Sequence, residues 1–253
     1  MTKGISIICA TFNAERTIGN LLESIRNQSC KDFEFIIVDG KSDDNTEAII
    51  NENRDLVDKF ISEKDNGIYD AWNKGLQNAK FEWISFVGAD DTLKPDYVKT
   101  YLEYLAKHDV QMDYVSSKVL LIDQNGNTIR TLGTPWKWSE FKHKMTVAHV
   151  GSLHHINLFK NAGIYDINYK IVGDYELLLR KRNELKAHFV NKTTAYMLMG
   201  GSSLSFAALA ERYKAQTKTA KMYKPIALWN YFRGCIELLK FKIEYELFHK
   251  TSR

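Results

Sequence analysis

The chain has 253 residues, of which 44% are hydrophobic and 26% are charged, a composition typical of a globular protein rather than a disordered one. Its length suits one large α/β domain, alone or with an appendage. The three cysteines are far apart and lack Cys-x-x-Cys spacing, so neither a disulfide framework nor a cysteine zinc site is expected. No apolar run approaches the roughly 20 residues of a membrane span, and the run at residues 5–10 is too short for a signal-peptide core. We expect a protein of the reducing cytosol.

Charge is distributed unevenly along the chain. The net charge is +4, but residues 212–253 alone contain ten Lys or Arg and only three Glu. The remaining residues are slightly acidic. A basic tail on an acidic body indicates a segment that meets an anionic surface. The tail has no nucleic-acid reader motif and no basic stripe along a helix, so nucleic acid is not the expected partner.

The first ninety residues alternate strand and helix patterns. Four apolar runs have the length of buried strands, at residues 5–10, 33–38, 60–62 and 83–87. Apolar residues recur at helical spacing over residues 18–25 and 69–79. Asp44 and Glu47 resemble a capping box for a further helix. Repeated strand–helix units predict a parallel sheet with right-handed crossovers and helices on both faces.

After residue 110 the pattern is less regular. Residues 114–122 and 128–132 flank the dipeptide Asn125-Gly126, which predicts a hairpin. A helix is expected from about Asp174 and a late strand over residues 187–198. The second half therefore predicts a mixed region built onto the same sheet.

Small polar and acidic residues follow three of the four early strands. Thr11 and Asn13 follow the first, Asp39 follows the second, and Asp90 with Asp91 follow the fourth. The carboxyl ends of parallel strands meet at one edge of a sheet, where open α/β sheets bind ligands. Two adjacent carboxylates repel each other, and a hard divalent cation such as Mg²⁺ or Mn²⁺, carrying a phosphorylated substrate, relieves that repulsion.

The acidic pair also has a plain structural interpretation. Asp91 could cap a helix that begins near Pro95. The chain lacks both a Gly-x-Gly-x-x-Gly fingerprint and a P-loop. A phosphate at this edge therefore has to be neutralised in another way, for which a metal held by the acidic pair is suited.

Four segments in succession resemble the motifs of family 2 glycosyltransferases with the GT-A fold. They are SIICATFNA at 6–14, VDGKSDDNT at 38–46, DNGIYDAWNKG at 65–75 and GADD at 88–91. The similarity covers residues 4 to about 110 and continues more weakly through GDYEL at 173–177. It is nearest to the subgroup that builds bacterial surface polysaccharides such as O-antigen, capsule or colanic acid. The resemblance implies a Rossmann-like mixed sheet flanked by helices, with a C-terminal helical extension.

The resemblance also implies a division of the chain. Residues 1–204 would form the GT-A catalytic domain, with a nucleotide-sugar-binding half at 1–110 and an acceptor half at 111–204. Residues 205–253 would form a basic amphipathic helical extension. Within it, an apolar stripe is formed by Trp229, Phe232, Ile236, Leu239, Ile243 and Leu247. Such a helix can lie on an anionic membrane surface, pack on the core or form a homodimer, and the stripe alone does not decide between them.

Donor binding is implied for seven residues of the first half. They are Thr11, Asn13, Glu15, Asp39, Asp65, Lys74 and Asp90. Asp39 would hydrogen-bond the nucleotide base, and Thr11, Asn13 and Glu15 would line the same pocket. A turn-forming role is the alternative for Asp39. Asp65 and Lys74 would lie near the ribose and diphosphate, and Asp90 would contact the ribose or the donor sugar.

Metal binding is implied for Asp91, which would hold Mn²⁺ or Mg²⁺. The family often has an Asp-x-Asp motif at this point, but the first position here is Ala89. We therefore expect a metal held by one protein carboxylate together with the diphosphate of the donor.

Asp174 occupies the place of the family's catalytic base. Sugar transfer with inversion needs a carboxylate that deprotonates the attacking hydroxyl, and a metal stabilises the charge on the leaving diphosphate. Helix capping is the structural alternative for Asp174. Glu176 would be a second candidate base, and His154 would contact the diphosphate or the acceptor.

The resemblance thus implies an inverting, metal-dependent hexosyl- or N-acetylhexosaminyltransferase. Its donor would be a UDP-sugar, or a GDP-sugar as second choice, and its acceptor a lipid-diphosphate-linked saccharide at the inner face of the bacterial cytoplasmic membrane. Two other hypotheses remain: a sugar-phosphate nucleotidyltransferase and a non-catalytic saccharide-binding module. The first normally has a Gly-rich basic loop after the first strand, which residues 11–15 do not provide.

Overall fold

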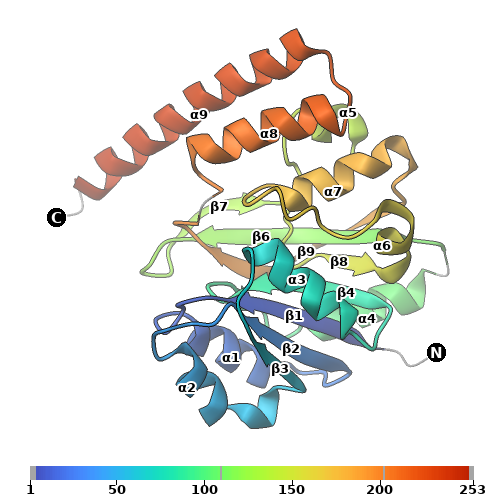
Figure 1. The fold of residues 1–253 in the computed structure, drawn as a ribbon, viewed down its shortest axis with the longest axis vertical. Helices are drawn as coiled ribbons and strands as arrows, with labels where there is room; N and C mark the ends of the chain where they lie inside the picture. Colours follow the sequence, from blue (N-terminus) through green and yellow to red (C-terminus); the bar gives the residue numbers. More distant parts are fainter. Residues whose placement is uncertain (1–3, 109, 202, 251–253) are drawn as a thin grey trace.

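The computed structural model describes residues 4–108, 110–201 and 203–250, with the backbone alone for 246–250. Within them, a nine-stranded mixed sheet lies between helices, and three further helices are stacked at one side (Figure 1). The strands are β1 (Ile5–Thr11), β2 (Phe33–Asp39), β3 (Lys59–Ser62), β4 (Trp83–Gly88), β5 (Thr92–Leu93), β6 (Tyr114–Ile122), β7 (Thr128–Leu132), β8 (Leu153–His155) and β9 (Ala187–Leu198). The helices are α1 (Ile18–Arg26), α2 (Thr46–Glu52), α3 (Ile68–Gln77), α4 (Tyr97–Lys107), α5 (Trp138–Phe141), α6 (Ile156–Ala162), α7 (Gly173–Lys181), α8 (Phe206–Lys218) and α9 (Lys224–Lys250).

The first four strands form the parallel part of the sheet, as the sequence predicts. The strand order is β3-β2-β1-β4-β8-β6-β9-β5, with β7 beside β6. The register places Thr11 beside Asp39 and Ala10 beside Gly88, so the carboxyl ends of β1, β2 and β4 are aligned. β8 runs antiparallel to both β4 and β6, which makes the sheet mixed.

Strand β1 is buried along its whole length. Its side chains alternate between two hydrophobic clusters: Ile5 and Ile7 belong to one that includes residues of α1, α2 and α4, whereas Ile8 and Ala10 belong to one that includes residues of α3, α6 and α7. Helices cover both faces of the parallel strands, and this is why those strands are continuous apolar runs in the sequence.

The start of α2 differs from the sequence expectation. The N-cap residue is Asn45, and it makes no side-chain capping hydrogen bond, so the expected capping box is wrong. The carboxylate of Asp44 instead accepts the backbone N–H of Thr46 at 2.9 Å and that of Glu15 at 3.1 Å. Asp44 therefore joins the loop after β1 to the start of α2, a long-range contact that local spacing does not reveal.

The second half adds the predicted hairpin of β6 and β7, and β9 runs parallel to β6. Helix α8 packs against α7 on one side and α9 on the other, and Figure 1 shows the three helices stacked away from β1 and β2. Pro225 is the second residue of α9, consistent with its preference for the first turn. Among the described helices, none has the length and hydrophobicity required to cross a bilayer.

Candidate active site

Three carboxylates gather at the aligned ends of β1, β2 and β4. The buried thiol of Cys9 lies among them, and burial together with their negative charges raises the pKa of that thiol well above its ordinary value. The charges are those of Asp91, Asp90 and Asp39. The structure thus brings the predicted strand-end residues together on one edge of the sheet.

Asp39 organises the turn after β2. Its carboxylate is fully buried and accepts the N–H groups of Lys41 and Ser42 at 3.1 and 3.0 Å and the Ser62 hydroxyl at 2.8 Å. Lys41 has a φ of 68°, so the turn passes through the left-handed region and needs these bonds to hold it. Asp39 therefore does form the turn in this structure, and a hydrogen bond from a nucleotide base to its carboxylate stays a prediction.

Asn13 and Glu15 hold the loop after β1 against the loop after β2. The Asn13 N–H donates to the Ser42 hydroxyl at 2.9 Å, and a Glu15 oxygen accepts the backbone N–H of Asn45 at 3.1 Å. The Thr11 hydroxyl is buried beside them and lacks a hydrogen-bond partner within the described part of the chain. Hydrogen bonds thus join the two loops, with one unpartnered polar atom buried beside them.

Asp65 lies directly over the backbone of Gly40. A Cβ at position 40 would come within 2.8 Å of Oδ2 of Asp65 and 3.3 Å of Cδ2 of Phe12, so glycine is needed for this close approach. The Phe12 ring is 62% exposed at the same place. We did not single out Phe12 from the sequence, although an aromatic residue between Thr11 and Asn13 was a readable signal.

Lys74 is not a free cation in the structure. Its ammonium pairs with the Glu63 carboxylate at 3.0 Å and donates to the Lys64 carbonyl at 2.9 Å. The side chain therefore holds the segment before Asp65, and the expected contact with a diphosphate would require it to leave these partners.

Asp90 and Asp91 lie on the same side of Gly88. A Cβ on Gly88 would be 2.7 Å from Oδ1 of Asp90 and 3.2 Å from Oδ2 of Asp91, so the space above this glycine is occupied by carboxylate oxygens. Asp91 is buried and accepts the Gly88 N–H at 2.8 Å, whereas Asp90 is exposed. Burial, and then the charge of Asp90, raise the pKa of Asp91 well above its ordinary value.

The chemistry of this pair fits a hard divalent cation. The described residues contain no group of three or more His, Cys, Asp or Glu that could hold a metal. Two carboxylates suit an ion that takes its other ligands from phosphate oxygens and water, as Mg²⁺ commonly does. Helix capping does not explain Asp91, because β5 follows it and the N-cap of α4 is Asp96.

Asp174 lies in the first turn of α7 and is partly buried. Its Oδ1 accepts the Tyr175 N–H at 2.8 Å and lies 3.1 Å from the Tyr69 hydroxyl. Its Oδ2 makes no hydrogen bond to any described residue. The N-cap of α7 is Val172, so Asp174 is not the cap. A hollow of about 140 Å³ opens beside Asp174, with Arg212 of α8 in its lining.

Glu211 of α8 anchors the segment that precedes Asp174. Its carboxylate accepts the backbone N–H groups of Lys170, Ile171 and Val172 at 2.9 to 3.1 Å. The sequence gives no signal for this role, because the donors are about forty residues away from the acceptor. Glu211 fixes the entry to the helix that carries the candidate base.

Comparison with known proteins identifies the family. The family model for glycosyl transferase family 2 matches residues 6–167. The chain belongs to this family. It is 30% identical over 179 residues to the PGL/p-HBAD biosynthesis glycosyltransferase of Mycobacterium tuberculosis H37Rv, a match that covers 69% of this chain and 68% of the relative.

Solved structures agree on the fold of this glycosyltransferase. The S. aureus TarS 1–349 complex with UDP-GlcNAc superposes with a TM-score of 0.68 at 17% identity, over 88% of this chain and 69% of that one. The mannosyltransferase PcManGT of Pyrobaculum calidifontis, in complex with GDP-Man and Mn²⁺, gives 0.64 at 15% identity, over 92% and 73%. The protein is thus a glycosyltransferase with the GT-A fold.

Glu176 of the glycosyltransferase, the second candidate base, is engaged in an ion pair. It is buried and forms a two-pronged ion pair in which Nε of Arg180 donates to both of its oxygens, at 3.1 and 3.0 Å. The Thr219 hydroxyl also donates to it at 2.8 Å. Both of its oxygens are thus engaged, and a role for Glu176 as a second base would require it to leave these partners.

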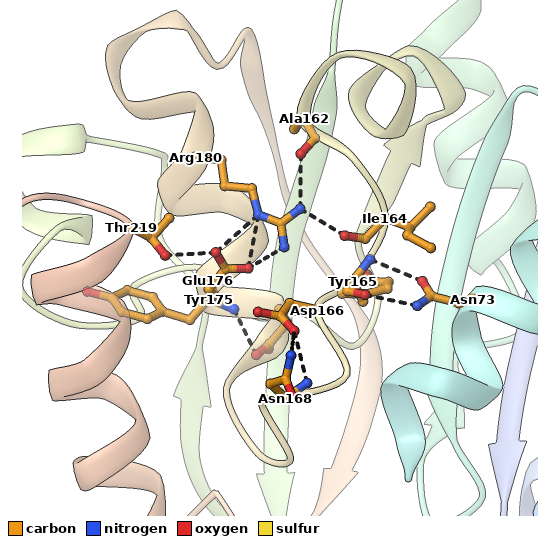
Figure 2. A network of polar contacts seen from close by, with 11 residues as sticks. Asn73, Ala162, Ile164, Tyr165, Asp166, Asn168, Tyr175, Glu176, Arg180 and Thr219 are labelled. Atoms are coloured by element: carbon orange, nitrogen blue, oxygen red, sulfur yellow. Dashed lines mark hydrogen bonds and ion pairs between the residues drawn. The ribbon is translucent and has the colours of Figure 1, made fainter. Parts of the chain in front are cut away.

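A hydrogen-bond network around the same ion pair connects α7 with α3. Figure 2 shows Arg180 also donating to the carbonyls of Ala162 and Ile164, at 2.9 and 2.8 Å. The next residue, Tyr165, exchanges two hydrogen bonds with the side-chain amide of Asn73 on α3, at 2.9 and 3.0 Å. The network therefore fixes α7, with its candidate base, relative to a helix of the first half.

His154 lies in the core and not at the strand ends, so its predicted contact with the diphosphate or the acceptor would require it to move. It lies on β8 opposite Ile84 of β4, is completely buried and packs edge-on against the rings of Phe86 and Tyr114. Burial lowers the pKa of His154 well below its ordinary value, and the neighbouring His149 lowers it further. His154 is thus held as a neutral side chain inside an aromatic cluster.

Proposed function

We propose that this glycosyltransferase transfers a sugar, with inversion, from a metal-bound nucleotide-sugar to a hydroxyl of a saccharide acceptor, using Asp174 as the base. The observation that carries the proposal is the placement of Asp174. Asp174 lines a hollow, no described residue donates a hydrogen bond to its Oδ2, and its Oδ1 accepts one from Tyr69 of α3. This joins the candidate base to the helix that follows Asp65.

The donor would bind across the ends of β1 and β2. Asp39, Asn13 and Glu15 would shape the walls, and the Thr11 hydroxyl lies buried beside them without a described partner. The exposed Phe12 ring could stack on the nucleotide base, an arrangement that tolerates several bases. A UDP-sugar is our first choice of donor and a GDP-sugar the second.

Asp91 would hold Mn²⁺ or Mg²⁺, with Asp90 beside it reaching the ribose or the donor sugar. When bound, such an ion would neutralise negative charge on the departing diphosphate. Because no three ligating side chains come together among the described residues, the donor and the ion would bind more tightly together than either alone.

The transfer step that we propose uses Asp174 as the base. The acceptor hydroxyl oxygen attacks the anomeric carbon, its proton passes to Oδ2 of Asp174, and the bond from that carbon to the diphosphate oxygen breaks on the opposite face. A single displacement of this kind inverts the anomeric configuration. General base catalysis by a positioned carboxylate contributes about 10² to 10⁴ in rate, so Asp174 should matter far more for turnover than for donor affinity.

The acceptor class that we propose is a lipid-diphosphate-linked saccharide, used in building a bacterial surface polysaccharide of the O-antigen or capsule type. This would place the enzyme peripherally on the inner face of the cytoplasmic membrane. Residues 1–110 would then serve the donor, residues 111–204 the acceptor, and residues 205–253 the membrane.

A nucleotide-sugar screen with Mn²⁺ tests the proposal. The expected result is thermal stabilisation by one donor and slow release of its nucleoside diphosphate, with the first-formed sugar anomer opposite to that of the donor by NMR. Asp174→Asn should bind the donor but fail to turn it over, and Glu103→Gln, an exposed carboxylate on α4, is the matched control. Release of pyrophosphate would indicate a nucleotidyltransferase, and saccharide binding indifferent to nucleotide and metal would indicate a binding module; either result contradicts the proposal.

A further inference from the structure

Helix α9 has one face that packs on the protein. Ala227, Asn230 and Leu238 are buried on this face, and the Asn230 carbonyl accepts a hydrogen bond from Arg212 of α8 at 3.3 Å. Gly234 lies so close to α8 that an added Cβ would meet the Arg212 guanidinium and would lie 2.9 Å from a methyl of Leu209. The docked face is therefore a close-packed contact between two helices.

The opposite face of α9 exposes large apolar side chains to water. With about 100° of rotation per residue, steps of three and four residues place these side chains in one stripe opposite the docked face. We call this set the α9 stripe; its members are Trp229 (68% exposed), Phe232 (54%), Ile236 (55%), Leu239 (49%) and Ile243 (57%). The side chain of Leu247, the remaining residue that the sequence assigns to this stripe, lies outside the described residues.

The exposure of the α9 stripe requires an explanation. The sequence left open whether the stripe packs on the core, and the structure shows that other residues of α9 do so. Soluble monomers rarely expose a contiguous apolar patch of several large side chains, and such patches mark sites that bind a protein or a membrane. The α9 stripe is therefore a docking surface.

The charges beside the α9 stripe indicate what it binds. At 100° per residue, Lys224 and Lys242 lie along one edge of the stripe, and Arg233 and Lys240 lie along the other. All four are exposed, and the Lys242 ammonium lies 5.7 Å from the centre of the Phe206 ring on α8. An apolar stripe between two rows of long basic side chains is the arrangement of a helix that lies in the interface of an anionic bilayer, because the stems bury while the charged ends reach the headgroups.

A second copy of the chain fits the same edges less well. Paired α9 stripes would bring basic edge against basic edge in either the parallel or the antiparallel orientation, and like charges at such positions are destabilising. Two acidic residues, Glu244, which is exposed, and Glu237, which pairs with Arg233 at 3.5 Å, lie beyond Arg233 on the side away from the stripe. Charge complementarity therefore favours an anionic lipid surface.

We propose that α9 binds the protein to an anionic bilayer, with the α9 stripe inserted between lipid headgroups and the helix axis parallel to the surface. Helix α8 separates α9 from the Asp174 hollow, because Leu209 and Arg212 line that hollow and also pack beneath Gly234. Bilayer binding thus brings the hollow within one helix layer of the lipid surface. The lipid contact stands without any catalytic assignment, but its value for reaching a lipid-linked acceptor rests on the proposed function.

Vesicle flotation of the full chain tests this proposal. We expect binding to vesicles that contain phosphatidylglycerol, weaker binding to pure phosphatidylcholine, and a loss of binding as salt is raised. Brominated lipid should quench part of the tryptophan fluorescence of the wild type, and this quenching should be lost in Trp229→Phe. The double variant Phe232→Ser/Ile236→Ser should bind at least tenfold more weakly, because two large apolar side chains no longer leave water on binding.

Matched variants separate the alternatives. Val110→Ser/Ile167→Ser changes two exposed apolar residues that lie outside α9 and should bind vesicles like the wild type, and circular dichroism melts check that every variant folds. Equal flotation of wild type and Phe232→Ser/Ile236→Ser would overturn the proposal. So would a wild-type dimer in analytical ultracentrifugation that this double variant makes monomeric, without vesicle binding. Release of nucleoside diphosphate from a soluble donor should be the same in the double variant and the wild type, so a failure of catalysis is distinguishable from a failure of membrane binding.

Discussion

Replacement of Glu211 by alanine should lower turnover without weakening donor binding. The Glu211 carboxylate accepts three backbone N–H groups ahead of α7. A hydrogen bond to a charged group contributes about 1.5–3 kcal/mol. Two of the three donors, the N–H groups of Ile171 and Val172, are partly buried. At about 1.5 kcal/mol for each of these two bonds, their loss costs roughly 3 kcal/mol, and water that enters the site recovers a part of it.

A net loss of about 2 kcal/mol in holding the segment before Asp174 corresponds to a fall of about 30-fold in kcat. The donor KM should stay unchanged, because the strand-end residues that shape the donor site do not contact Glu211. Glu211→Gln keeps one oxygen acceptor but loses the charge, and should fall between Glu211→Ala and the wild type. Lys218→Ala, an exposed change on the same helix, is the control.

The assay is steady-state release of nucleoside diphosphate from the donor found in the screen, with a thermal melt of each variant. Wild-type kcat in a folded Glu211→Ala protein would refute the positioning argument. A rise in donor KM by the same factor as the fall in kcat would also refute it, because it would show that Glu211 supports the donor site and not the base.

Three further predictions concern other parts of the molecule. Gly88→Ala should raise the Mn²⁺ concentration needed for half-maximal turnover by about tenfold or more, because the new methyl group displaces the two carboxylate oxygens above it; an unchanged metal titration would contradict this. Arg180→Ala leaves the buried Glu176 without its cation and should destabilise the fold by about 3 kcal/mol, as measured by denaturant unfolding. Adding Glu176→Gln to this variant should restore part of the lost stability. Unfolding of Arg180→Ala like that of the wild type would show that the pair is dispensable. His154 has a pKa held below that of the unfolded chain by burial, so the unfolded state gains a proton first as pH falls below about 6.5 and stability is lost. Between pH 7.5 and 5.5 the wild type should lose about 1.4 kcal/mol more than His154→Phe, and equal losses in the two proteins would show that His154 is not kept neutral.

The parallel half of the fold and the meeting of its strand ends could be predicted from the sequence. Both follow from local information: strands buried on two faces are continuous apolar runs, and small polar or acidic residues mark where each ends. The adjacency of Thr11, Asp39 and Asp91 follows once the strands are parallel and neighbouring.

The roles of individual side chains depend on partners that are distant in sequence. His154 sits on a three-residue strand between β4 and β6, an antiparallel insertion that no periodicity marks. Glu211 finds its donors in a loop packed against α8. Glu176 is the exception, because its partner Arg180 is four residues further along the same helix, a spacing that already indicates an ion pair.

The central claim is that Asp174 acts as the base on a donor held at the strand ends. The most direct measurement compares wild type and Asp174→Asn for donor affinity by calorimetry and for nucleoside diphosphate release with Mn²⁺. The account predicts nearly equal donor affinities and a fall in turnover of about 10² or more. Turnover by Asp174→Asn equal to that of the wild type would contradict it.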